Sequence, residues 1–323
     1  MPASVTHSYF ANDVYDILSD DIKQRLLLPS TKMFAQSTDA LLFYRLFSLR
    51  PGKQIRSLQK TFHKSKTQEF FLSVISYMKE HQLQEDKDTC SFLVGFITHY
   101  VLDMIVHPFV FYKTGCFKKN VPSSYKYNGL HTFMETYIDN YLIKKRENIN
   151  PYTFSVSKFC FDIKKFSLPL TQTIDQAFSS VYQVPNMGEI YYQSLKDMKF
   201  SIRAFREDRY GIKRAIYKIL DTFMPKNVLR FESISYHYPM NDHHDFLNFK
   251  HELWRNPTTY SITSRDSFYD LYIKALKTAK KIIEDTFSYL NGNDIDLTKV
   301  FTNCSYITGL DCNLKKELKY FLF

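Results

Sequence analysis

Two short patterns of imidazole and carboxylate side chains stand out in this sequence of 323 residues. The first is formed by His99, Asp103 and His107, which follow one another at intervals of four. The second is formed by His131 and Glu135, again four apart. Side chains at this spacing share one face of an α-helix, so each pattern can direct its nitrogen and oxygen atoms to one point. Zinc prefers these donors, and the two patterns together predict a metal site.

The surroundings of the first pattern indicate that it is buried. The stretch from Thr89 to Tyr112 is nearly all apolar and is long enough to be mistaken for a membrane span. Ionisable side chains on one face would be costly in lipid without partners, so we expect a central helix of a soluble bundle instead. Metals suit this mixture of buried polar groups, and the alternative is a hydrogen-bonded network without metal. We expect Pro108 to bend or end the helix.

The elements that must position these residues are predicted to be helices. Apolar residues recur at helical spacing and the chain has only eight glycines, so the expected fold is an all-α, multi-helix bundle with a buried metal cluster. We expect a metal-binding helical core over residues 1–150, with a helical part over 151–323 packed on it in the same domain or beside it. The expected helices are 10–18, 39–47, 66–79, 89–112, 130–145, 168–182, 188–205, 211–223 and 264–290.

Composition adds weaker constraints on partners and compartment. The formal charge of +10 and a pI near 9.1 favour phosphate groups, nucleic acid or an anionic membrane surface. The short basic runs at 118–119 and 144–146 are typical of solvated helix ends, so they predict no defined binding patch. Five widely spaced cysteines without a C-x-x-C pair predict reduced, structural thiols. The first residues lack the features of a secretory signal, and we expect a cytoplasmic protein.

The two patterns and their order resemble the zinc-dependent bacterial phospholipases C, which are related to fungal single-strand zinc nucleases. The resemblance is carried by THYVLDMIVHPFVFY at 98–112 and LHTFMETYID at 130–139, separated by a short loop. Upstream, the family places a His near the N-terminus, an Asp in a later segment and a further His beyond it. His7, Asp39 in QSTDALLFY and His63 in QKTFHKSKTQEFF match these positions.

The resemblance implies a shared cluster of two or three zinc ions. One ion would be held by Asp39, His63, His99 and Asp103, and a second by His107, His131 and Glu135. A third would be held by His7 and a bridging Asp103, with the free N-terminal amine completing the site. In this chain Met1 and Pro2 leave only a short segment before His7, and removal of Met1 would make Pro2 the residue that offers the amine.

On this basis the expected function is phospholipase C-like hydrolysis of a phospholipid or a small phosphoester. Neighbouring zinc ions neutralise phosphate oxygens and make a bound water nucleophilic near neutral pH, and Asp39 would act as ligand and general base. We also expect contact with a membrane surface. The alternatives are a zinc-dependent nuclease and a non-catalytic, metal-stabilised binding protein. The family positions that frame choline with aromatic rings are Ala40 and Lys60 here, so a choline preference is not indicated.

A second group of histidines lies in the irregular stretch 231–263, namely His237, His243, His244 and His251. We know of no metal role for them. Packing of this loop around Trp254 is the main expectation, and contact of His237 or Asn248 with substrate is the alternative. His81 is expected at a helix end, and Asp139 is expected to pair with a cation or to support a ligating His.

Overall fold

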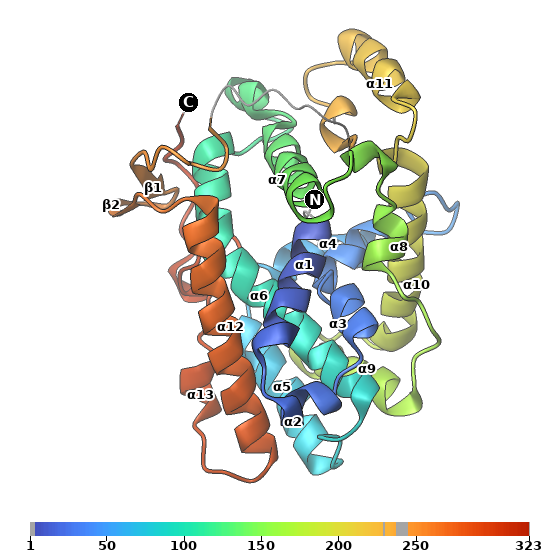
Figure 1. Cartoon of the computed structure of the whole chain (residues 1–323), viewed down its shortest axis with the longest axis vertical. Helices are drawn as coiled ribbons and strands as arrows, with labels where there is room; N and C mark the ends of the chain where they lie inside the picture. Colours follow the sequence, from blue (N-terminus) through green and yellow to red (C-terminus); the bar gives the residue numbers. More distant parts are fainter. Residues whose placement is uncertain (1–3, 229, 237–244, 323) are drawn as a thin grey trace.

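The computed structural model describes residues 4–228, 230–236 and 245–322, and within these it is a bundle of helices with one small hairpin (Figure 1). The α-helices are α1 (Ser4–Ile17), α2 (Asp20–Gln24), α3 (Leu28–Phe34), α4 (Lys53–Phe62), α5 (Thr67–Glu80), α6 (Lys87–Thr114), α7 (Leu130–Glu147), α8 (Val156–Cys160), α9 (Leu168–Tyr182), α10 (Met187–Ser201), α11 (Ile212–Phe223), α12 (Phe268–Leu290) and α13 (Leu297–Val300). Short 3₁₀ turns are η1 (Ser37–Phe43), η2 (Pro122–Tyr127), η3 (Pro151–Thr153), η5 (Glu232–Ile234) and η6 (Cys312–Leu314), and η4 (Ile202–Arg206) is a π-turn. Strands β1 (Trp254–Asn256) and β2 (Thr259–Ser264) pair antiparallel. The predicted all-α class is confirmed.

Helix α6 forms the centre of the bundle (Figure 1). The Asp86 side chain caps its start by accepting from the Thr89 amide at 2.8 Å. Helices α1, α3, α7 and α12 all pack against it. Its most apolar 18-residue window is 89% buried inside the protein, so the apolar run is a core helix, as expected from its ionisable stripe.

Pro108 does not end α6, which continues to Thr114. A proline removes the hydrogen bond to the carbonyl four residues earlier, here that of Met104. The backbone of Gly309 covers this carbonyl so closely that a Cβ at Gly309, where φ is +65°, would lie 2.6 Å from the oxygen. The helix therefore does not end at Pro108, and that part of the expectation is wrong. The loop that contains Gly309 packs over the carbonyl whose hydrogen bond the proline removes.

Other differences from the sequence expectation are local. Residues 39–47 were predicted as a helix, but η1 ends at Phe43 and is closed by i→i+3 bonds such as Tyr44 N to Leu41 O at 3.1 Å. The segment before η1, which contains Pro29, forms helix α3. Proline is tolerated in the first turn because an amide there would have no hydrogen-bond partner within the helix. Helices α2, α4, α8 and α13 and the hairpin were not anticipated, and the hairpin interrupts the stretch expected to be irregular.

Side-chain contacts fasten the N-terminal helix to α7 and α12. Arg146 of α7 binds Asp13 through both guanidinium nitrogens, at 2.7 and 2.6 Å. The Tyr272 hydroxyl of α12 also donates to Asp13, at 2.7 Å. These contacts fix the two helices that carry His7 and the His131 pattern relative to each other.

Candidate metal centre

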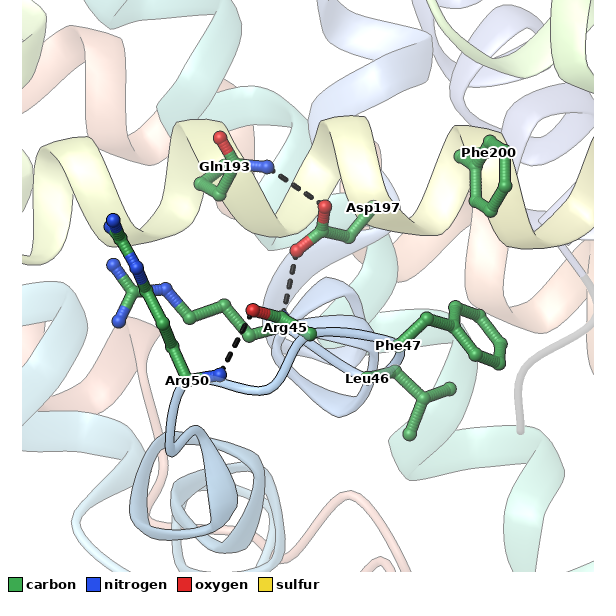
Figure 2. A pocket seen from close by; sticks show the side chains of 8 residues that line it. Arg45, Leu46, Phe47, Arg50, Gln193, Asp197 and Phe200 are labelled. Atoms are coloured by element: carbon green, nitrogen blue, oxygen red, sulfur yellow. Dashed lines mark hydrogen bonds between the residues drawn. The ribbon is translucent and has the colours of Figure 1, made fainter.

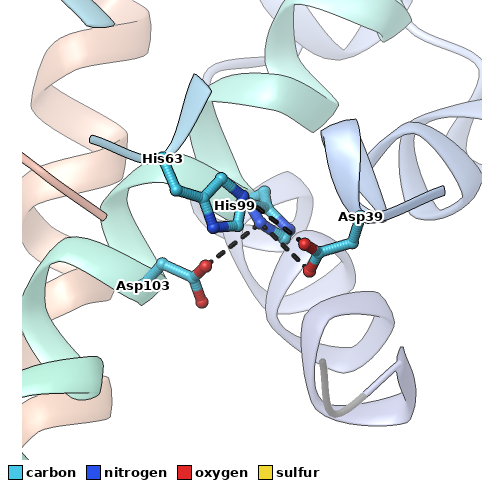
Figure 3. A group of neighbouring side chains, drawn as sticks. All are labelled: Asp39, His63, His99 and Asp103. Atoms are coloured by element: carbon cyan, nitrogen blue, oxygen red, sulfur yellow. Dashed lines mark ion pairs between the residues drawn. The ribbon is translucent and has the colours of Figure 1, made fainter. Parts of the chain in front are cut away.

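The first group of candidate ligands is Asp39, His63, His99 and Asp103, whose donor atoms all lie within 4.8 Å of one another (Figure 3). They come from η1, the end of α4 and the middle of α6. His99 Nε2 lies 3.1 Å from Asp103 Oδ2 and 3.6 Å from Asp39 Oδ2, and His63 Nε2 lies 3.4 Å from Asp39 Oδ1. Zinc bonds of about 2.0–2.1 Å in tetrahedral geometry place ligand atoms roughly 3.3 Å apart, which matches these separations.

Orientation of the donors separates a cation site from a simple ion-pair network. Despite the short distances, His63 Nε2, His99 Nε2 and Asp103 Oδ2 are buried and make no hydrogen bond to an atom of the described residues. Buried polar atoms without partners are costly and rare. These atoms therefore converge on a common point instead of on one another, and the donor set fits a zinc ion.

The second group is His107, His131 and Glu135, which lie on α6 and α7. Glu135 Oε1 lies 3.1 Å from His131 Nε2 and 3.5 Å from His107 Nε2. This group is more accessible than the first, because the side chains of His107 and His131 are 12% and 23% exposed, whereas that of His99 is fully buried. A substrate would meet the second group first.

Asp103 links the two groups and also contacts the N-terminal helix. Its Oδ2 lies 3.4 Å from His107 Nδ1, and its Oδ1 lies 3.3 Å from His7 Nε2. The His7 ring stacks on that of His99 at 4.1 Å, and its Nδ1 is buried with no hydrogen bond to the part of the chain that the structure describes. The N-terminal amine expected to complete a third site lies outside the described residues.

Two backbone carbonyls orient the imidazoles. His99 Nδ1–H donates to Ala35 O at 2.8 Å, and His107 Nδ1–H donates to Tyr306 O at 2.9 Å. Each bond leaves the Nε2 lone pair of its ring directed towards the carboxylates, which is the tautomer that a metal requires. No sequence pattern predicts that either carbonyl would bind an imidazole.

Tyr306 and Gln59 were also missed by sequence reasoning. The Tyr306 ring is buried and stacks on His63 at 4.6 Å with an interplanar angle of 2°. The Gln59 amide, one helical turn before His63, lies 2.7 Å from Asp39 Oδ1 and 3.1 Å from His63 Nδ1. Both residues restrict the rotation of the ligands that they contact. The i, i+4 spacing of Gln59 and His63 is the one signal that the sequence offered.

Neighbouring imidazoles lower the pKa of two carboxyl groups in the cluster, those of Asp103 and Glu135. Burial alone would raise the pKa of Asp103, but His107, His99 and His7 lower it well below its ordinary value. Glu135 behaves in the same way beside His131 and His107, so its pKa is also lowered. Burial lowers the pKa of His63 to about 4. Burial opposes protonation of His107, yet Asp103 and Glu135 raise its pKa to about 9.

Asp139 acts on the start of α1 and not on a ligating His. Its carboxylate accepts hydrogen bonds from the Val5 and Thr6 amides at 3.2 and 2.8 Å and from the Tyr236 hydroxyl at 2.7 Å. Burial raises its pKa, and nearby Arg206 opposes this shift. A carboxylate at the first turn of α1 fixes the helix that carries His7.

Of the later histidines, His237, His243 and His244 lie outside the described residues. His251 is exposed, is 3.5 Å from Asp270 and takes no part in either donor group. The Asn248 side chain is buried and donates to the carbonyls of Glu252, Arg265 and Asp266, while the Trp254 indole donates to the last of these. Asn248 therefore holds the loop around Trp254. His81 caps the end of α5, as expected.

A cavity of about 480 Å³ opens beside the second donor group. His131 forms part of its wall together with aromatic rings, amides and one cation from three segments of the chain. The other lining residues include Phe111, Phe117, Lys119, Tyr127, Asn128, Asn227 and Val228. This mixed wall suits a ligand with both apolar and anionic parts.

Comparison with known proteins gives one positive finding. The family model described as zinc-dependent phospholipase C matches residues 6–183, which covers all eight candidate ligands and continues past residue 150 into α9. No curated protein and no solved structure matches the chain.

Proposed function

Because the chain belongs to the zinc-dependent phospholipase C family, we propose that it hydrolyses a phosphodiester bond in a phospholipid or a small phosphoester. The observation that carries the proposal is the pair of buried donor groups joined by Asp103 and opening, at His131, on a cavity. A closed structural site would leave no such access. A substrate can reach bound metal ions only if one side of the nitrogen-and-oxygen cluster is accessible.

We assign the ligands to two or three zinc ions. Asp39, His63, His99 and Asp103 would hold one ion, and His107, His131 and Glu135 would hold another. His7 and Asp103 supply two donors for a third. Zinc bound there would neutralise the phosphate oxygens and provide a deprotonated water near neutral pH.

Asp39 is our candidate general base. The Gln59 amide holds its Oδ1 at 2.7 Å, and its Oδ2 lies towards His99, so the carboxylate has a single fixed orientation. A general base must first lie within reach of the proton that it removes. In the wall of the cavity at His131, the Lys119 ammonium offers a donor for an anionic group.

The test combines metal content with activity on four substrates. We expect about two to three zinc ions per chain, with large losses in His99→Ala and His131→Ala. Hydrolysis of bis-p-nitrophenyl phosphate together with phosphatidylcholine or phosphatidylinositol would support the proposal. Activity confined to single-stranded DNA would assign a nuclease instead. A zinc-loaded protein inactive on all four would leave a metal-stabilised binding protein.

A further inference from the structure

Helix α11 is oriented with its apolar face to solvent (Figure 1, upper right). Five large apolar side chains recur at helical spacing along one stripe and are all exposed: Ile212 61%, Ile216 48%, Ile219 61%, Leu220 43% and Phe223 84%. Tyr217, on the other side, is the buried side chain of the helix. A surface helix of a globular protein normally packs its apolar stripe on the core, so this orientation leaves the stripe without a partner among the described residues.

Polar contacts hold α11 in this orientation. Asp208 caps its start by accepting from the amides of Lys213 and Arg214 at 3.1 and 2.8 Å. Lys213 Nζ donates to Glu207 O at 2.6 Å, and the Tyr217 hydroxyl donates to Phe205 O at 2.9 Å. The inward face is thus the hydrogen-bonded one, and the apolar stripe cannot turn inward without breaking these bonds.

Lys and Arg outnumber Asp and Glu around α11, and Glu232 pairs with two of the cations, Arg214 and Lys218, at 3.4 and 3.5 Å. Residues 201–230 contain eight Lys or Arg and three Asp or Glu, whereas the whole chain has 43 and 33. The three acids are turned to backbone amides: Glu207 accepts from Ser157 N, Asp208 caps α11, and Asp221 accepts from the amides of Phe231 and Glu232. Arg203, Arg209 and Lys226 are exposed. An apolar stripe bordered by cations is typical of helices that lie in the headgroup region of a membrane.

The loop of residues 44–52 also exposes apolar and basic side chains. Figure 2 shows the side chains of Arg45 and Arg50 extending together on one side of this loop, with Phe47 on the other side near Phe200. The Phe47 ring stacks on Phe205 at 4.9 Å, and Leu49 is fully exposed. The Phe205 carbonyl also accepts from the Tyr217 hydroxyl on the inward face of α11.

We propose that the exposed face of α11 docks on an anionic lipid surface. A second copy of the chain would bring two positively charged regions together, whereas anionic headgroups complement them. Ile212, Ile216, Ile219, Leu220 and Phe223 enter the boundary between headgroups and acyl chains, and the flanking cations contact lipid phosphates.

The position of α11 also connects the lipid surface to the metal centre. The helix ends at Phe223, and within five residues the chain forms the wall of the cavity at His131 through Asn227 and Val228. Asn128 donates to the carbonyls of Lys226 and Val228 at 2.7 and 2.6 Å and fixes this connection. The docked helix therefore places the cavity mouth next to the bilayer. This last step rests on the proposed function, whereas docking itself does not.

Vesicle co-sedimentation of the zinc-loaded protein tests the proposal. We expect binding to vesicles of equimolar phosphatidylcholine and phosphatidylglycerol, and weaker binding to phosphatidylcholine alone. The double variant Ile216→Asp, Ile219→Asp should bind the anionic vesicles about tenfold or more less tightly. The matched control Leu168→Asp, Ile273→Asp changes two exposed apolar residues on α9 and α12 and should bind like the unaltered protein.

Soluble-substrate activity and mass in solution separate the outcomes. The α11 variant should keep its zinc and its activity on bis-p-nitrophenyl phosphate, because its side chains lie outside both donor groups. Failure of that activity in every protein, with vesicle binding intact, would count against the hydrolase and not against docking. Docking is overturned if the unaltered protein stays in the supernatant, if the α11 variant binds equally well, or if light scattering shows a dimer that this variant dissociates.

Discussion

Helices α6 and α11 depart from the usual distribution of polar and apolar side chains in opposite directions. Helix α6 places His99 and Asp103 in the interior of the bundle, where the first is fully buried. Helix α11 places Ile219 and Phe223 in solvent and keeps its hydrogen-bonding face against the protein. In both helices the unusual side chains have no sufficient partner within the described chain.

The comparison indicates that each helix is completed by something other than protein. Converging nitrogen and oxygen atoms that are buried need a cation, because an unpartnered buried charge is costly. A stripe of exposed apolar side chains needs an apolar environment, and lipid provides one. The same folding rules therefore identify two binding partners of different chemistry.

The largest effect is expected from Asp103→Asn, which removes the charge shared by both donor groups. We expect the zinc content to fall and kcat/KM on bis-p-nitrophenyl phosphate to drop about a thousandfold, because a metal ion contributes several kcal/mol to such reactions. Metal analysis and initial rates provide the measurement. The control Asp285→Asn on α12 removes a carboxylate paired with Lys281 and should leave both quantities unchanged. Full metal content and activity in Asp103→Asn would remove Asp103 from the ligands of the site.

A pair of isoleucine substitutions sharpens the contrast between the two helices. Ile97→Ala on α6 creates a cavity at a fully buried position and should lower the free energy of unfolding by about 3 kcal/mol. Ile219→Ala on α11 removes an exposed side chain and should change it by less than about 0.5 kcal/mol. Urea unfolding of the zinc-loaded proteins measures both. Equal losses would mean that α11 packs on the protein in solution.

A smaller effect is expected from Gln59→Ala, which removes an amide that contacts Asp39 and His63. Loss of a group that orients ligands typically lowers metal affinity by about tenfold to a hundredfold. Zinc affinity measured by competition with a chelating dye provides the test, and Gln54→Ala, an exposed change on the same helix, is the control. An unaltered affinity in Gln59→Ala would show that the ligands are held without this amide.

The smallest effect is the release of about one proton from His107 when zinc binds near pH 7. In the metal-free cluster Asp103 and Glu135 raise the pKa of His107 to about 9, from 6.5. The raised pKa stabilises the metal-free fold below pH 6.5, and this contribution is lost as pH rises through 9, whereas zinc affinity rises over the same interval. Calorimetric titrations in buffers of different ionisation enthalpy count the protons, and His107→Gln should release one fewer. No difference between the two proteins would contradict the raised pKa.

The sequence alone determined the helical class and the chemistry of the central helices. A period of four in His99, Asp103 and His107 inside an apolar run specifies one polar stripe on a buried helix. The bounds of α9 agree with those expected from its pattern, because the residues that begin and end that helix act locally. The spacing of residues in the sequence was sufficient to predict the features that residues close in sequence determine.

Tertiary structure decided which distant groups meet. Ala35 and Tyr306 contribute backbone carbonyls to the imidazoles of α6, and a carbonyl is the same in every residue type, so no pattern can predict its use. In the same way, periodicity reveals the apolar stripe of α11 but not the direction in which it faces. That direction depends on hydrogen bonds between α11 and Phe205, Glu207 and Phe231, because a helix is oriented by the contacts that its neighbours offer and not by its own sequence.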